Sequence, residues 1–396
     1  MNKVSLKISP NIYYAQLSSS RSINLYQETL LRCIESVKLS IATIGLRNPK
    51  IGKKDHSWEY CDPFDWVMSF RTGQLWLAAS LTGEQTFIIN ASARNKDFRK
   101  ILENPLEFDH DLGFQFSLSC VANWKITGNK EARSLALRAA EALSHRFNQA
   151  GNYIQAWNPK VNDPERSRFV TGRIIADTMQ NIALLYWAHF ESGISAFKEI
   201  ADAHAQTSMK YLIREDGTSY HTFMFDPATG VPVRGETHQG YADESCWARG
   251  HAWMIHGFAQ SYLYTKNQEY LKTAILLANT AEKLMGDDLV PVWDYKLSKD
   301  EIPYKDSSAG AIMAAGLYIL ASVSTDDAPR FTAFADRLLN GLIETCDLTK
   351  DPKALGLLAH GASHVGAGYA DNMLPYGDYY FMEALMRSLG HNHFFW

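Results

Sequence analysis

Apolar residues recur along most of the chain at the spacing of an α-helix. Between residues 22 and 44, for example, Leu30, Ile34, Val37, Ile41 and Ile44 fall three or four positions apart, which places them on one face of a helix. The same pattern predicts twelve helical segments: 22–44, 73–81, 84–100, 111–127, 130–148, 175–192, 194–214, 244–265, 268–285, 307–323, 329–345 and 377–389. Helices and their connections therefore account for nearly the whole chain.

The links between the expected helices alternate in character. Short ones at 81–84, 126–129 and 264–267 end one helix and begin the next within a few residues, which favours antiparallel neighbours. The others are long and rich in Gly, Pro, Trp and Tyr: 46–72, 102–110, 151–172, 216–243, 287–306 and 349–376. This alternation is typical of a closed ring of helical hairpins with functional loops on one face. No low-complexity or Pro/Ser-rich linker divides the chain, so we expect one domain over residues 1–396, with residues 1–20 as an N-terminal extension.

Composition and charge narrow the range of partners. The 39 Lys and Arg residues against 43 Asp and Glu give a net charge of -4, which provides no basic field for nucleic acid or an anionic membrane. The longest apolar stretch, 309–323, is shorter than the ~20 residues of a membrane-spanning helix. Residues 1–20 contain no unbroken apolar run of a secretory signal. We therefore expect a cytoplasmic protein with neither a nucleic acid nor a membrane as partner.

The cysteines and the glycine-rich motifs exclude several kinds of chemistry. Five dispersed cysteines without a C-x-x-C pair favour reduced, mostly buried thiols over disulfides or a zinc site: Cys33, Cys61, Cys120, Cys246 and Cys346. The sequence contains no phosphate-binding glycine loop, dinucleotide fingerprint, H-E-x-x-H helix or G-x-S-x-G elbow. Acid/base chemistry without a metal or a cofactor is the remaining expectation.

Two long links end in an aspartate at the point where a helix resumes. Asp111 follows Asp109 and His110, whose side chains could hold its carboxylate or raise its pKa. Asp177 lies among Ile174, Ile175 and Met179, so partial desolvation should raise its pKa and suit it to general acid catalysis. The common alternative for either aspartate is to cap the following helix.

The segment 238–253 carries the densest set of polar and aromatic side chains. If a helix begins near residue 243, Ser245, Arg249 and Trp253 lie on one face, with Trp247 nearby. An arginine beside indoles can grip a carboxylate while the rings pack on a sugar. The alternative is an interior tryptophan stripe with a structural arginine. His221, in the preceding link, indicates no role by itself.

At these residues the chain resembles the unsaturated glucuronyl hydrolases of glycoside hydrolase family 88. The resemblance rests on residues 110–114, 174–179, 238–253 and 376–385, and it covers the chain beyond about Trp66. It implies a single all-α (α/α)6 barrel, in agreement with the twelve segments. Members of the family hydrate the vinyl-ether C4=C5 bond of a non-reducing 4,5-unsaturated uronic acid, and the hemiketal that forms then opens and releases the neighbouring sugar.

The resemblance also implies a role for each matching residue. Asp177 would be the general acid/base and Asp111 the second essential carboxylate. The side chains expected around the substrate are His110, His221, His238, Gln239, Trp66, Trp157, Trp247, Arg249 and Trp253. The expected partner is an unsaturated uronyl di- or oligosaccharide of the glycosaminoglycan type, and the reaction needs no metal or cofactor.

One departure from the family pattern concerns the neighbouring sugar. Arg71 follows Trp66 where relatives often have aromatic and Pro residues, which would place a cation either near the rim of the site or facing solvent. Residues 363–368 lack the Ser and Lys with which some relatives hold a sulfate. These two signs point in opposite directions.

Three alternatives share the helical ring. An unsaturated rhamnogalacturonyl hydrolase would act on pectin fragments, although segment 238–253 fits family 88 more closely. An inverting glycosidase would use Asp111 as base and Asp177 as acid around an ordinary glycosidic bond. A non-enzymatic carbohydrate-binding toroid would need only the richness in Trp and Tyr.

Overall fold

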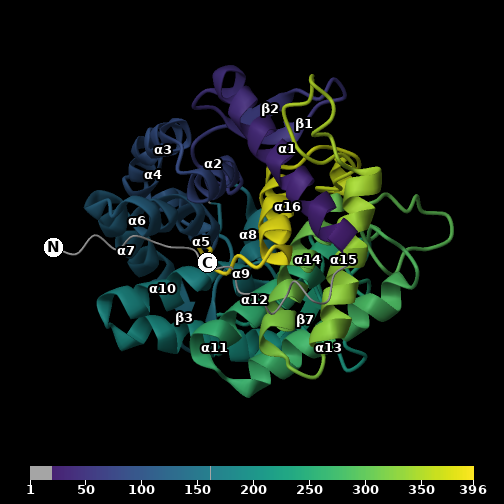
Figure 1. The fold of residues 1–396 in the computed structure, drawn as a ribbon. Coiled ribbons are helices and arrows are strands. Elements are labelled where there is room, and N and C mark those ends of the chain that lie inside the picture. The colour runs from purple at the N-terminus through teal and green to yellow at the C-terminus, as the bar shows by residue number, and fades with distance from the viewer. Residues whose placement is uncertain (1–19, 161) are drawn as a thin grey trace.

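A closed ring of helices forms the body of the protein, and the computed structural model describes it over residues 20–160 and 162–396 (Figure 1). The inner layer of the described part consists of α2 (Met68–Thr82), α5 (Leu112–Phe116) with α6 (Ala122–Thr127), α9 (Thr178–Asn181) with α10 (Ala183–Ser192), α12 (Ala248–Thr265), α14 (Ser307–Val323) and α16 (Pro375–Ser388). The outer layer consists of α1 (Ser20–Ile44), α3 (Gln85–Ser92) with α4 (Asn95–Leu102), α7 (Lys130–Ser144), α11 (Ser195–Tyr211), α13 (Gln268–Met285) and α15 (Ala328–Thr345). Inner and outer helices alternate along the chain, and α16 closes the ring against α2.

The sequence of each helix determines its layer. Helix α14, which holds the longest apolar stretch, is buried over every residue from Ser307 to Ala321. Its small residues allow close packing, because a Cβ at Gly316 would lie 3.0 Å from the backbone of His256 in α12. The outer helix α7 instead buries one face, whose residues, such as Leu135 and Ala139, recur every three or four positions. No helix in the described residues is long and apolar enough to cross a membrane.

The turns from inner to outer helices are short and alike. Helices α2, α6 and α10 each end at a glycine in the left-handed conformation, with φ of 69° at Gly83, 71° at Gly128 and 76° at Gly193. Lys266 takes the same place after α12 with a φ of 57°. A left-handed residue satisfies the last helical carbonyl groups and reverses the chain at once. The next outer helix therefore begins two residues later in each case.

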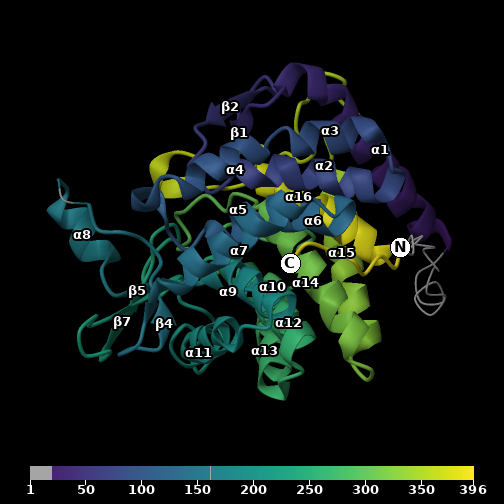
Figure 2. The same ribbon diagram turned by 90° about the vertical axis from the view of Figure 1, so that its left-hand side faces the viewer.

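The long links contain regular structure that the sequence did not reveal. Segments expected mainly as loops form the antiparallel hairpins β1 (Asn48–Gly52) with β2 (Trp58–Cys61) and β3 (Phe147–Asn148) with β4 (Tyr153–Ile154), the helix α8 (Pro164–Val170), the 3₁₀ turns Pro105–Glu107 and Val365–Ala367, and an antiparallel sheet of β5 (Arg173–Ile175), β6 (Thr222–Phe225) and β7 (Pro232–Glu236). Strand β3 instead replaces the last two residues of the helix expected over 130–148, and β5 overlaps the start of the helix expected over 175–192. Helix α8 and strand β7 project from one end of the ring (Figure 2). The helix expected over 84–100 is broken into α3 and α4, and the one over 111–127 contains a π-helical turn at Ser117–Val121.

The segment 394–396 fills the centre of the ring. The Trp396 indole stacks on Tyr380 of α16 with ring centroids 5.7 Å apart, and its Nε1 donates to Oε2 of Glu383 at 2.8 Å. Tyr264 of α12 donates its hydroxyl to the carbonyl of Trp396 at 2.9 Å. The mark for this end of the chain lies near the middle of the ring in Figure 1. Core residues of several inner helices therefore depend on this segment for their packing.

Two further expectations concern the cysteines and the N-terminus. All five cysteines are free, and all but Cys61 are buried, as predicted. The N-terminal extension expected over residues 1–20 lies outside the described residues up to residue 19.

Candidate active site

Asp111 and Asp177 occupy equivalent places at the starts of two inner helices. Asp111 directly precedes α5 and Asp177 directly precedes α9, yet neither side chain accepts a hydrogen bond from its own helix. The capping alternative is therefore wrong for both. Each carboxylate is almost completely buried, with 7% and 8% of the residue exposed.

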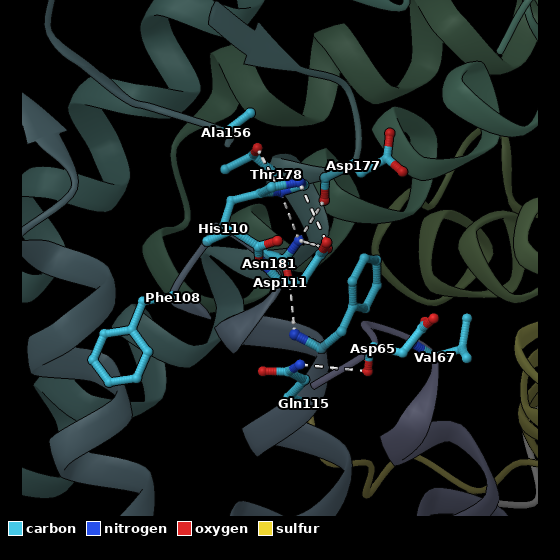
Figure 3. Close-up of polar contacts among 12 residues, drawn as sticks. Asp65, Val67, Phe108, His110, Asp111, Gln115, Ala156, Asp177, Thr178 and Asn181 are labelled. Carbon is cyan, nitrogen blue, oxygen red and sulfur yellow. Dashed lines mark hydrogen bonds and ion pairs between the residues drawn. The ribbon is translucent and has the colours of Figure 1, made fainter. Parts of the chain in front are cut away.

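A hydrogen-bond network links Asp111 to α9 (Figure 3). Asn181 Nδ2 donates to Asp111 Oδ1 at 3.2 Å and to His110 Nδ1 at 3.1 Å, and the Thr178 hydroxyl lies 3.0 Å from the same His110 nitrogen. Because Nδ1 of His110 accepts these bonds and burial holds its pKa well below the usual value, the ring is neutral with its proton on Nε2. That nitrogen lies 3.5 Å from Asp111 Oδ2.

His221 faces the carboxylate of Asp177 with its Nε2, as His110 faces that of Asp111. The backbone N–H groups of His238 and Gln239 both donate to His221 Nδ1 at 3.1 Å. Burial lowers the pKa of His221 well below its usual value, so the ring is neutral and carries its proton on Nε2. Nε2 lies 3.8 Å from Asp177 Oδ2. Each aspartate thus faces one neutral imidazole N–H.

The small sheet holds His221 opposite Asp177. Ile175 of β5 pairs with Thr222 of β6, and the N–H of Ala176 donates to the carbonyl of His221 at 2.9 Å. β5 ends at this pair, and Asp177, two residues after Ile175, leads directly into α9. The register of the strands therefore brings together two residues that lie 44 positions apart in the sequence.

The electrostatics of the site favour protonated carboxyl groups. Burial raises the pKa of Asp177 to about 7, against the opposing charge of Arg249. Its Oδ2 is buried and has no hydrogen-bond partner within the described residues. Burial, together with the charges of Asp109 and Asp177, raises the pKa of Asp111 well above its usual value. Asp177 can therefore give or take a proton near neutral pH, as a general acid/base must.

The Arg249 guanidinium lies between the rings of Trp247 and Tyr376, and some of its N–H groups already donate hydrogen bonds within the protein. Its guanidinium carbon is 4.4 Å from the Trp247 ring centroid and 5.2 Å from that of Tyr376. Three of its five N–H groups donate at 2.6 Å, to Asp306 Oδ2 and to the carbonyl groups of residues 362 and 363. The predicted grip on a substrate carboxylate can therefore use only its two other N–H groups.

The helical face predicted for segment 238–253 differs from the structure. Helix α12 begins at Ala248, so Ser245 lies outside it and donates its hydroxyl to Asp294 at 2.6 Å. Trp253 has no exposed surface, and its ring packs 5.0 Å from Phe114 and 5.3 Å from Tyr380. Contact of Trp253 with a substrate stays a prediction.

Rings surround the imidazole of His238. The rings of Trp157 and Phe169 each lie 5.4 Å from it, and that of His364 lies at 5.3 Å. The guanidinium of Arg166 on α8 lies 5.1 Å from the Trp157 ring. Phe169, His364 and Arg166 were not identified from the sequence: Arg166 and Phe169 lie on α8, and His364 belongs to another link that only the fold brings to this place.

A second ring pair and an amide complete the set of predicted residues. Trp66 stacks on Tyr376 with centroids 4.9 Å apart and 29° between the planes. Gln239 Nε2 donates to the carbonyl of Ser363 at 3.0 Å. Within the described residues, no group of three or more His, Cys, Asp or Glu side chains is arranged to hold a metal ion.

Arg71 lies neither at the rim of the site nor in solvent, so both interpretations of it were wrong. It is 3% exposed, and its Nη2 donates to the carbonyl of Val37 at 2.8 Å and to the hydroxyl of Ser40 at 3.0 Å. Its Nη1 donates to Gln74 at 3.2 Å. Arg71 thus joins α2 to the outer helix α1 and contributes no charge to substrate recognition.

Comparison with known proteins decides the family. The model of Glycosyl Hydrolase Family 88 matches residues 49–387. The chain belongs to this family. It is therefore a glycoside hydrolase, and the two aspartates that its fold brings together lie within the matched region.

Curated relatives and solved structures extend over most of the chain. The unsaturated glucuronyl hydrolase of Bacillus sp. (strain GL1) is 36% identical over 92% of this chain and 96% of the relative. The unsaturated chondroitin disaccharide hydrolase of Streptococcus pyogenes serotype M1 is 34% identical over 89% of this chain and 88% of the relative. Superposition on the crystal structure of the Bacillus enzyme gives a TM-score of 0.85, and the match covers 91% of this chain and 96% of the Bacillus chain. An unsaturated glucuronyl hydrolase mutant from Streptococcus agalactiae, complexed with dGlcA-GalNAc6S, is 26% identical, covers 100% of this chain and 99% of that one, and gives 0.81. The predicted (α/α)6 barrel is confirmed.

Proposed function

We propose that this family 88 hydrolase releases the terminal 4,5-unsaturated uronic acid from glycosaminoglycan oligosaccharides that a lyase has produced. The observation that carries the proposal is Asp177, a buried carboxyl whose pKa burial raises to about 7 and whose Oδ2 has no hydrogen-bond partner in the described part of the chain. The relatives named for unsaturated glucuronyl and chondroitin disaccharide substrates support the same reaction. We further propose that the chain acts as one catalytic domain.

The reaction would hydrate the C4=C5 bond in two proton transfers. Asp177 in its acid form donates its proton to C4, and the developing positive charge at C5 is shared with the ring oxygen. A water molecule then adds through its oxygen to C5 and returns a proton to the Asp177 carboxylate. The C5 hemiketal opens to a ketone and leaves C1 as a hemiacetal, from which the neighbouring sugar departs.

The two imidazole N–H groups would stabilise charge that changes during this cycle. When Asp177 has lost its proton, the Nε2–H group of His221 is the donor that faces the new carboxylate. Asp111 and His110 would bind sugar hydroxyl groups across the site and fix the position of the ring. The stacked rings of Trp66 and Tyr376 would offer a flat face to the planar unsaturated sugar.

Loss of the ultraviolet absorbance of the conjugated double bond tests the function. Unsaturated disaccharides from lyase digests of chondroitin, hyaluronan, heparin and pectin would each be incubated with the enzyme. We expect the absorbance to fall with glycosaminoglycan disaccharides. Turnover of pectin fragments alone would favour the rhamnogalacturonyl alternative. Cleavage of saturated substrates alone would favour an ordinary inverting glycosidase, and binding without turnover a carbohydrate-binding toroid.

The pKa of Asp177 predicts the alkaline side of the pH profile. The acid form is the proton donor, and it predominates below a pKa of about 7. We therefore expect kcat to fall tenfold for each pH unit well above 7. The measurement is kcat from the absorbance assay between about pH 5 and about pH 9, at saturating substrate. A kcat that rises steadily over this range would contradict proton donation by Asp177.

A further inference from the structure

The start of α5 has an unusual acceptor for its free backbone N–H groups. An aspartate in the position of Asp111 would ordinarily accept the N–H of Phe114, three residues later, with its own carboxylate. That N–H instead donates to Asn181 Oδ1, which reaches across from α9, at 2.5 Å. The first turn of α5 is therefore capped by another helix, and the carboxylate of Asp111 is not used for this purpose.

The other end of the same amide acts on the carboxylate. Asn181 Nδ2 faces Asp111 Oδ1 at 3.2 Å, His110 Nδ1 at 3.1 Å and the backbone carbonyl of Asp177 at 3.3 Å. These three atoms are acceptors in this arrangement and the Phe114 N–H is a donor, so only one orientation of the amide satisfies them. Asn181 is fully buried and contacts both aspartate segments (Figure 3).

A glycine allows the two helices to approach closely enough. A Cβ at Gly113 would overlap the carbonyl oxygen, Cα and Cβ of Asn181. Any other residue at position 113 would therefore push α9 away from α5. The contact between the amide and Asp111 thus depends on both Gly113 and Asn181.

We infer that Asn181 is a positioning residue for Asp111, which it releases from helix capping and turns towards the substrate. This inference rests on the proposed function, in which Asp111 is the second essential carboxylate. Without Asn181, the carboxylate would rotate to the vacant Phe114 N–H and leave the site. The hydrogen bond from Asn181 also favours the ionised form of Asp111.

Other charged and titratable groups act on Asp111 as well. They come from its own loop, from across the site and from neighbouring segments, and comprise Asp109, His110, Asp177, Asp65 and Arg146. Of these side chains, His110 also contacts the Asn181 amide through Nδ1, so a substitution at position 181 changes the surroundings of His110 as well as those of Asp111. A change in the pH profile of such a variant therefore reports the loss of the amide.

Three variants test the inference. Asn181→Ala removes both ends of the amide, and kcat should fall on the order of 100-fold, with KM changed less than about threefold, because a displaced catalytic group affects mainly the transition state. Asn181→Asp keeps the oxygen for Phe114 N–H, and only its protonated form can donate to Asp111. Its kcat relative to wild type should therefore be higher at acidic than at alkaline pH.

Asn123→Ala is the matched control. Asn123 is also fully buried and lies on α6, which follows α5 in the inner layer. Its amide contacts Asn95 and Thr127. This variant should lose stability but keep the wild-type kcat and pH profile. A crystal structure of Asn181→Ala without substrate would show whether Asp111 now caps α5. We expect its carboxylate to accept the N–H of Phe114.

The outcomes separate this inference from the proposed function. Absence of turnover by the wild-type enzyme would refute the proposed function. The crystal structure of Asn181→Ala would still show whether Asn181 keeps the Asp111 carboxylate from capping α5. Wild-type kcat and pH profile in both Asn181 variants, or an unmoved Asp111 carboxylate in the crystal, would overturn the inference. Failure of both Asn181 variants to fold, with a folded Asn123→Ala, would also overturn it, because Asn181 would then be a structural residue only.

Discussion

Asp177→Asn is expected to lower kcat by roughly 1,000-fold, the range of a lost general acid/base, while substrate binding is largely retained. The amide has the shape of the carboxyl group but neither gives nor takes a proton at any pH of the assay. Turnover would be followed by the loss of ultraviolet absorbance and binding by calorimetry with an unsaturated disaccharide. Near-normal turnover in this variant would remove Asp177 from its proposed role.

Asp378 provides a matched control for this prediction. Its carboxyl is also buried, with a pKa raised by burial to about 7, but it accepts the N–H of Leu358 and so anchors a link to α16. Asp378→Asn should change stability more than kcat. That result would show that a raised pKa is not sufficient for catalysis. Asp177 differs from Asp378 in its Oδ2, which faces His221 and has no hydrogen-bond partner among the described residues.

Arg249→Ala is expected to lower the free energy of unfolding by about 3–5 kcal/mol, because Asp306 would be left buried without its ion-pair partner. The sequence predicted mainly a weaker affinity for the substrate, and the structure adds this larger effect on folding. Urea denaturation would measure it. Wild-type stability with a changed KM would show that Arg249 acts only as a binding group.

Two further variants, one at Arg166 and one that combines Arg249 with Asp306, separate the loss of the buried ion pair from the loss of side-chain volume. Arg166→Ala removes a half-buried cation that has no hydrogen-bond acceptor among the described residues, and should cost less than about 1 kcal/mol. Replacing Arg249 and Asp306 together removes the unpaired charge, and should recover part of the stability lost in Arg249→Ala. An equally unstable double variant would assign the loss to packing between Trp247 and Tyr376.

The helical ring was predictable because its helices are long enough to show their period. The strands were not, since β5 has three residues and its Ile174 and Ile175 continue the apolar pattern of the helix that follows. The site could be predicted in part. The apolar neighbours of Asp177 predicted the direction of its pKa shift, which the structure confirms with burial as the cause.

Other parts of the site depend on contacts between distant segments. Asn181 follows Thr178 and Gln180, so the sequence does not distinguish it from its polar neighbours, and its role follows only from the approach of α5 at Gly113. Arg71 was misplaced because its acceptors, Val37 and Ser40, lie on a different helix. Spacing along the sequence carries no information about such partners.

The seat of Trp396 has a consequence for the order of events during synthesis. Its indole packs between Tyr379, Tyr380 and Phe114, and its Nε1 satisfies a carboxylate of α16 that no solvent reaches. A nascent chain synthesised only as far as α15 lacks this side chain. Until residues 394–396 are made, the inner faces of the earlier helices lack these aromatic partners, and such exposed apolar surface favours aggregation and chaperone binding.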